Sequence, residues 1–241
     1  MSQEYEGTSP LPEFLSQAKP THFSDNHREF KTHGGLTSVW SFDHFTEVQG
    51  EEVGVDPKKF VVKKYDFPKP IFKKVTFGEN YKVEDLEGQV SILKDKHRRA
   101  KEFFKELPDL VVPTQFMFSG KTRQDAHIYE IQRRVDGLIF ADGISLLDIR
   151  NFISQFSDEQ RFQLKASLEK VIHLFSNAIV EGASFVPDMN INNFGIDRDG
   201  CLYLVDTNVN ADWSSLLVAE FTDFQEKQID MLKTIVQKCF V

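Results

Sequence analysis

Hydrophobic and polar positions alternate differently in successive parts of the chain. From Phe30 to Tyr65 the sequence consists of short β-type segments, and the clearest reads Phe-Val-Val-Lys-Lys-Tyr at 60–65. β-Branched and aromatic residues are typical of strands, so we predict strands at 39–42 and 60–65. The segment 83–107 is rich in Glu, Lys, Leu and Ala, which predicts a helix, and Pro108 should end it.

The middle and C-terminal parts predict two strands and a long helix. The strands are expected at 111–118 and 128–135. The helix should begin after Ser157, because Ser157 and Gln160 have the spacing of a capping box, and Gly182 should end it. Its apolar positions recur at helical spacing and are Leu164, Leu168, Val171, Ile172, Phe175 and Ile179.

A short hairpin and a last helix follow. The segments 193–197 and 201–206 flank Asp199-Gly200, which we interpret as a two-residue hairpin turn. Four apolar side chains should attach this hairpin to the core: Phe194, Ile196, Leu202 and Leu204. The last amphipathic helix is predicted at 215–239, and its apolar positions are Leu217, Phe221, Phe224, Ile229, Leu232 and Val236.

The order of these elements predicts an α+β fold with two lobes. Strands, one helix and two more strands precede a mostly helical second half, which differs from the regular alternation of a parallel-sheet protein. We expect a flexible N-terminal arm at 1–31 and a small N-lobe at 32–135, made of an antiparallel sheet and one helix. A reduced, helical C-lobe should occupy 136–241.

Composition and charge narrow the class of protein. Of 241 residues, 40% are hydrophobic and 27% charged, so a packed core is expected and a disordered chain is not. The formal charge of −8 argues against a partner that is nucleic acid, and no apolar run is long enough to cross a membrane. The N-terminus lacks the pattern of a signal peptide, so we expect a cytoplasmic protein with Cys201 and Cys239 reduced. The basic run 94–99 predicts a solvated helix face or, alternatively, a docking surface for an acidic partner.

Three polar side chains flank the predicted hairpin at defined spacings. Asn193 follows Asp188 by five residues, and Asp206 follows Asn193 by thirteen. Because the hairpin folds the chain back, Asn193 and Asp206 should lie close together. Their oxygens are ligands that Mg²⁺ prefers, and Asp188 could accept the proton of a substrate hydroxyl. Asp and Asn are also frequent in turns, so an Asx-rich turn without catalytic function is the structural alternative.

This segment, 186–207, resembles the catalytic loop and metal-binding hairpin of the protein kinase-like superfamily, including its minimal aminoglycoside phosphotransferase and RIO-type branches. The resemblance implies a two-lobed protein kinase-like fold with a reduced C-terminal lobe, and binding of ATP and Mg²⁺. It also implies that Asp188 is the catalytic base and that Asn193 and Asp206 are the metal ligands.

Upstream residues occur in the order that the family has. Lys63 resembles the lysine that contacts the nucleotide phosphates, with Val61 at the adenine-facing position; Lys64 is the alternative. The helix predicted at 83–107 resembles the family's C-helix, whose glutamate pairs with that lysine. Glu87 would take this role, with Glu84 as the alternative.

The adenine and phosphate contacts implied by the resemblance are less specific. Gln132 would be the gatekeeper, and the backbone groups of Arg133 and Val135 would face adenine. Gly34 and Gly35 would belong to a phosphate loop that lacks the family's other glycine positions.

Several positions depart from the family pattern. Val186 or Pro187 stands where the family has a histidine, and Asn190 replaces a lysine or histidine. After Asp206, Thr207 and Asn208 replace the phenylalanine and glycine of the family. Only 35 residues follow Asp206, too few for a peptide-substrate platform, so a conventional protein kinase is not expected.

The expected function is therefore an ATP- and Mg²⁺-dependent phosphotransferase that acts on a hydroxyl, with a small molecule as the favoured substrate. The alternative is a catalytically inactive pseudokinase that serves as a nucleotide- or protein-binding module. A third interpretation keeps the same metal ligands and transfers the AMP part of the nucleotide.

Overall fold

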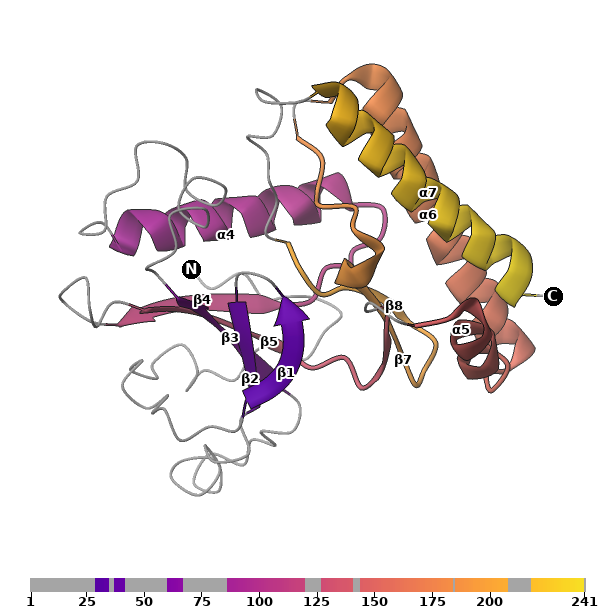
Figure 1. Ribbon diagram of the computed structural model, residues 1–241, viewed down its shortest axis with the longest axis horizontal. Helices are drawn as coiled ribbons and strands as arrows, with labels where there is room; N and C mark the ends of the chain where they lie inside the picture. The colour runs from indigo at the N-terminus through magenta and orange to yellow at the C-terminus, as the bar shows by residue number, and fades with distance from the viewer. Residues whose placement is uncertain are drawn as a thin grey trace. The chain divides into compact units, whose positions relative to one another are not determined.

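The computed structural model describes residues 29–34, 37–41, 60–66, 86–119, 127–140, 144–183, 185–207 and 218–240. Its helices and two antiparallel sheets confirm the α+β class (Figure 1). The chain divides into two compact units: unit 1 comprises Met1–Asp95 and Pro113–Arg134, and unit 2 comprises Lys96–Val112 and Val135–Val241. The domain boundaries expected after residues 31 and 135 stay predictions.

Unit 1 contains a five-stranded antiparallel sheet with the order β1-β2-β3-β5-β4. Its strands are β1 (Glu29–Gly34), β2 (Thr37–Ser41), β3 (Phe60–Asp66), β4 (Thr114–Ser119) and β5 (His127–Arg133). The predicted strands at 39–42, 60–65 and 128–135 correspond to β2, β3 and β5. Strand β4 begins later than expected, because Val111 instead forms a parallel bridge with Leu204 in unit 2.

Helix α4 (Leu86–Phe103) links β3 to β4 along the chain and continues from unit 1 into unit 2. It ends before Pro108, and Phe104 donates a last helical hydrogen bond to the Ala100 carbonyl at 3.0 Å. The basic run 94–99 is solvated only in part: Lys94, Asp95 and Arg98 are exposed, as the solvated-face interpretation expects, whereas two other residues are buried. Lys96 and His97 are only 9% and 5% exposed, because they share a helical stripe with the buried Ala100.

Unit 2 combines three helices with a small antiparallel sheet. The helices are α5 (Leu146–Ile153), α6 (Asp158–Glu181) and α7 (Val218–Cys239), and the sheet has the order β6-β7-β8. Its strands are β6 (Gly137–Ile139), β7 (Phe194–Asp197) and β8 (Leu202–Leu204). Helices α6 and α7 lie side by side, and α5 packs against α7 (Figure 1). No described helix is long and apolar enough to cross a membrane.

The ends of α6 are those predicted from its sequence. The Ser157 side chain accepts from the Gln160 amide at 3.2 Å, and the Gln160 side chain accepts from the Ser157 amide at 2.9 Å. Gly182 closes the helix in the left-handed conformation, with φ of 63°. Both signals act through adjacent backbone groups, which is why a local sequence pattern was sufficient to locate them.

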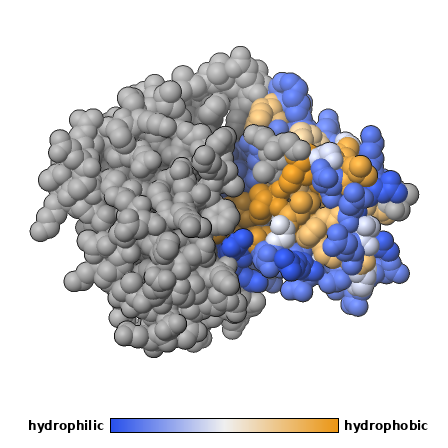
Figure 2. Space-filling view, turned by 60° about the horizontal axis from the view of Figure 1, so that its bottom comes forward, coloured by the Kyte–Doolittle hydropathy of each residue, from blue (hydrophilic) through white to orange (hydrophobic). Residues whose placement is uncertain are grey.

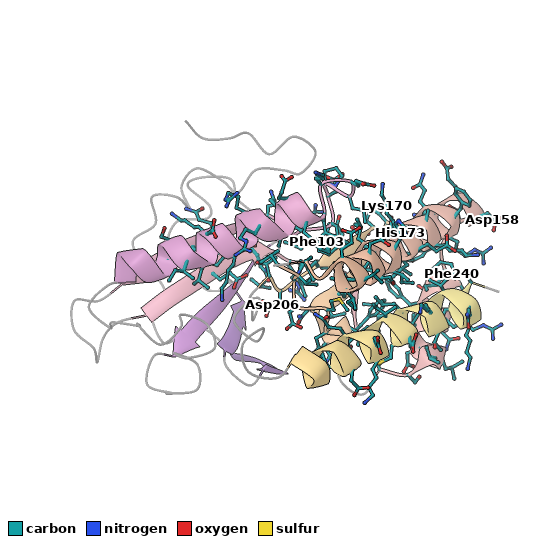
Figure 3. All side chains as sticks on the ribbon, turned by 90° about the horizontal axis from the view of Figure 1, so that it is seen from above. Phe103, Asp158, Lys170, His173, Asp206 and Phe240 are labelled. Carbon is teal, nitrogen blue, oxygen red and sulfur yellow. The ribbon has the colours of Figure 1, made fainter. Side chains whose placement is uncertain are left out.

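Helix α6 also holds the segment that follows α4. Lys170 forms an ion pair with Glu106, with Nζ 3.0 Å from Oε2, and donates to the Glu106 backbone carbonyl at 3.2 Å. The hydrogen bond and charge of Lys170 hold the pKa of Glu106 below its usual value. Figure 3 shows Lys170 and His173 on this side of α6.

The core of unit 2 is aromatic where α4, α6 and β7 meet. Phe175 packs edge-to-face on Phe104, with ring centroids 5.5 Å apart, and on Phe194 at 6.4 Å. All four apolar side chains predicted to anchor the hairpin are buried. Hydrophilic residues cover much of the visible described surface, and hydrophobic residues gather in one region of it (Figure 2).

The turn of the β7–β8 hairpin differs from the prediction. Asp197 donates from its amide to the Cys201 carbonyl at 3.0 Å, so the loop contains three residues, not two. Gly200 alone among them has a positive φ, 81°, whereas a two-residue type I′ turn needs two positive values. The Asp197 carboxylate stabilises the wider loop by accepting from the amides of Asp199 and Cys201 at 3.0 and 2.9 Å.

Helix α7 buries most of the expected face, but it differs from the prediction at Phe224 and at two buried glutamines. Phe224 belongs to the predicted apolar stripe but is 40% exposed, whereas Gln225 and Gln228 are only 4% and 9% exposed. The buried face continues through Ile229 and Leu232, which were predicted correctly. A hydrogen bond from the loop before β7 to Gln228, described below, accounts for one of the two buried glutamines.

Candidate catalytic and metal-binding site

The loop 188–193 is shaped by consecutive side-chain-to-backbone hydrogen bonds. Asp188 Oδ1 accepts from the Asn190 amide, and Asn190 Oδ1 accepts from the Asn192 amide, each at 3.0 Å. The Asn193 amide then donates to the Asn190 carbonyl at 2.9 Å and closes the 3₁₀ turn Ile191–Asn193. The Asx-rich turn considered as a structural alternative is therefore present. It also fixes the backbone that carries Asp188 and Asn193.

The β7–β8 hairpin brings the third residue of the motif to this loop. Val205, which precedes Asp206, donates from its amide to the Asn193 carbonyl at 2.7 Å. The Asn193 side chain connects to the start of the loop, because its Nδ2 donates to the backbone carbonyl of Asp188 at 3.4 Å. All three predicted residues thus belong to one local structure in unit 2. Asp206 is labelled in Figure 3.

The two carboxylates of the motif interact electrostatically. Burial raises the pKa of the Asp188 carboxyl, and the negative charge of Asp206 raises it further. Hydrogen bonds from the Asn190 amide and the Asn193 side chain act in the opposite direction. The arrangement therefore places two acidic groups where a cation would relieve their repulsion.

The donor set fits Mg²⁺ of the kind that binds together with phosphates. Among the described residues, no group of three or more His, Cys, Asp or Glu side chains could hold a metal ion by itself. Mg²⁺ commonly takes one or two carboxylates and completes its six oxygen ligands with water and substrate phosphates. Asp206 and the amide oxygen of Asn193 match that requirement, and a metal bound without a nucleotide is not expected.

The predicted nucleotide-contacting residues on β3 and β5 belong to unit 1. Val61 lies opposite Gln132 in the register, and Lys63 lies opposite Glu130, whereas Lys64 lies opposite Tyr129. Directly paired residues share one face of a sheet, and successive residues alternate between faces. Lys63 therefore shares a face with Val61, Gln132 and Glu130, and Lys64 is on the opposite face.

Glu130 is a potential functional residue that the sequence analysis missed. It is only 1% exposed, and its Oε1 lies 3.5 Å from Nε2 of Gln132, the predicted gatekeeper, which is 4% exposed. A buried carboxylate on the face that carries Lys63 is a second possible partner for that lysine, besides Glu87. Residues two apart in a strand share one face, so Glu130 could have been placed beside Gln132 from the sequence. A single Glu in a strand does not by itself indicate burial.

The remaining nucleotide-site candidates are placed only in part. Arg133 donates from its amide to the Pro113 carbonyl at 3.4 Å. Val135 belongs to unit 2, and its side chain lies beside Gly195 of β7. A methyl group added to Gly195 would be 3.4 Å from Val135 Cγ1. Gly34 ends β1 and pairs with Thr37. Glu87 lies in the first turn of α4, and nothing is described of its side chain.

Two predicted residues, Gly35 and Glu84, lie outside the described residues, so the phosphate loop and the alternative lysine partner stay predictions.

A second missed contact joins α4 to the residue after Asp206. His97 Nδ1 lies 3.2 Å from Thr207 Oγ1, and both side chains are buried. Thr207 is one of the departures from the family pattern, and it provides a polar partner where the family has phenylalanine. This pair could not be predicted from the sequence, because His97 lies within a run of basic residues.

Comparison with protein-family models, with curated proteins and with solved structures gives no match for this chain. The kinase-like interpretation therefore depends on the residue pattern and on the geometry of the Asp188, Asn193 and Asp206 motif.

Proposed function

We propose that this protein is an ATP- and Mg²⁺-dependent phosphotransferase with a two-lobed kinase-like fold, and that its acceptor is a hydroxyl, with a small molecule as the favoured substrate. The observation that carries the proposal is the convergence of Asp188, Asn193 and Asp206 on one rigid loop and hairpin, with Asp188 and Asp206 in electrostatic contact. An Asx turn without a catalytic role would not need two interacting carboxylates and an amide side chain in the same place.

The residues would divide the reaction between them. The acceptor oxygen attacks the γ-phosphorus of ATP, the bond from that phosphorus to the β–γ bridging oxygen breaks, and ADP leaves. Asp188 orients the acceptor hydroxyl and takes its proton. Its raised pKa makes it a better proton acceptor than an ordinary surface aspartate.

Asn193 and Asp206 would hold Mg²⁺, which when bound supplies charge neutralisation on the phosphates. Lys63 would contact the phosphates from unit 1. Most of the rate enhancement would then come from positioning and electrostatics, as is usual for phosphoryl transfer.

The first test is ATP binding followed by thermal unfolding, with and without Mg²⁺. A ligand that binds the native state raises the melting temperature by mass action. We expect a Mg²⁺-dependent rise in the wild type that is lost in Asp206→Asn. The control is Asp199→Asn, which changes an exposed carboxylate in the same hairpin and should keep the rise.

Asp188→Asn separates catalysis from nucleotide binding. We expect it to keep the Mg²⁺-dependent shift and to lower phosphate transfer by about 10²–10⁴-fold, the usual contribution of a general base. Full activity in Asp188→Asn would contradict the assigned role. A wild type that binds ATP without any transfer would favour the pseudokinase alternative, and no shift at millimolar ATP would contradict nucleotide binding itself.

A further inference from the structure

The loop 188–193 receives a hydrogen bond from a helix that is distant in the sequence. Gln228 on α7 accepts from the Ile191 amide, with Oε1 2.9 Å from the nitrogen. Gln228 is 9% exposed and Ile191 is 7% exposed, so this bond is buried. It lies at the centre of the segment that separates Asp188 from Asn193.

The rest of α7 makes Gln228 a rigid anchor. The next turns of its buried face contain Ile229, Leu232 and Ile235, all within the core of unit 2, and α7 packs on both α5 and α6. A buried amide oxygen that lost this bond would keep its desolvation penalty, so the bond specifies where the loop rests on the helix. The other loop bonds described above lie within the loop or, from Val205, join it to the end of the β7–β8 hairpin, and none of them attaches it to a helix.

We propose that Gln228 is a positioning residue that fixes the distance between Asp188 and Asn193 during catalysis. This inference rests on the proposed phosphotransferase function, since it assigns Gln228 a role in the same site. Phosphoryl transfer is sensitive to small displacements of the base relative to the metal ligands. The role also accounts for the buried polar side chain at 228, a position that core packing alone would fill with an apolar residue.

The chain offers a matched control for this proposal. Gln225 lies one turn before Gln228 on the same buried face, is 4% exposed, and its Nε2 makes no hydrogen bond within the described part of the chain. Gln228→Met and Gln225→Met make the same chemical change at neighbouring positions. Methionine keeps the length of glutamine and removes the amide, so only Gln228→Met deletes a bond to the loop.

The experiment measures release of phosphate from Mg·ATP with water as the acceptor, together with hydrogen exchange at the Ile191 amide. For Gln228→Met we expect kcat to fall about ten- to a hundredfold, with KM for Mg·ATP within about threefold of the wild type. Exchange at Ile191 should accelerate about tenfold. Gln225→Met should match the wild type in kcat, KM and Ile191 exchange.

Different results overturn the inference and the proposed function. Unchanged kcat in Gln228→Met despite faster Ile191 exchange would overturn the positioning role alone, as would an equal loss of kcat in Gln225→Met.

If Gln228→Met does not fold, Gln228→Glu carries the test, because it keeps an acceptor oxygen. It should keep Ile191 protected and kcat within about threefold, and loss of kcat with Ile191 still protected would overturn the role. A wild type that neither releases phosphate nor shows the Mg²⁺-dependent thermal shift would overturn the proposed function, and the role of Gln228 with it.

Discussion

Asp188 combines two properties that a structural turn residue does not need together. Its Oδ1 forms the Asx turn with the Asn190 amide, and its carboxyl also experiences burial and the charge of Asp206, both of which raise its pKa. The turn alone would be served equally well by asparagine, which carries no charge to desolvate. The charge at this position is therefore better explained by chemistry than by the turn, and Asp188→Asn separates the two roles.

Gly200 is the residue on which the geometry of the β7–β8 hairpin depends. Gly200→Ala should destabilise the protein by about 1–2 kcal/mol, because alanine is strained at a φ of 81°. The added Cβ would also meet Gln160 Cβ at 3.3 Å. Gly182→Ala is the control, since it has a similar φ of 63° and nothing within 4 Å of the added atom.

Thermal or urea unfolding of both variants separates backbone strain from crowding. We expect both to be less stable than the wild type, with the larger loss at Gly200. Equal losses would show that Gln160 moves aside without cost, and no loss at either position would contradict the left-handed assignment.

At the scale of elements, features set by neighbouring residues could be predicted from the sequence, and features set by tertiary contacts could not. The limits of α6 follow from Ser157, Gln160 and Gly182, which act on backbone groups within one turn. The burial of Gln228 on α7 could not be derived, because it depends on a hydrogen bond with the Ile191 amide, 37 residues away in the sequence. The motif of Asp188, Asn193 and Asp206 could be found because a hairpin joins its parts.

Strand register separates Lys63, the lysine preferred from the sequence, from its alternative Lys64. Lys63 shares the face of β3 with Val61 and with the buried Glu130 of β5, and Lys64 is on the other face. The sequence favoured Lys63 through its spacing from Val61, but only pairing with β5 shows that Glu130 and Gln132 share this face. We predict that Lys63→Ala weakens Mg·ATP binding at least about tenfold, as expected for loss of a charged phosphate contact.

Lys64→Ala is the matched control and should change the dissociation constant less than about twofold, because register places residue 64 on the face of β3 opposite to Val61 and Gln132. Titration calorimetry with Mg·ATP measures both. The reverse order of effects would assign the phosphate contact to Lys64 and contradict the register argument.

At the scale of the molecule, the residues assigned to one nucleotide come from both compact units. Lys63, Val61 and Gln132 belong to unit 1, while Asp188 and Asp206 belong to unit 2. Each unit has its own antiparallel sheet. The proposed function therefore predicts a response to nucleotide in each unit, and each response can be measured by itself.

Hydrogen exchange with and without Mg·ATP tests this directly. We predict slower exchange in β3 and β5 of unit 1, and in the segment 188–206 of unit 2, because ligand binding suppresses the openings that expose these amides. The middle of α6 provides an internal control, since its amides should change least. In Asp206→Asn the protection should disappear from both units together. Protection that appears in unit 1 alone, or that survives Asp206→Asn, would mean that the nucleotide does not reach the metal ligands assigned here, and the phosphotransferase would have to be abandoned in favour of a binding module.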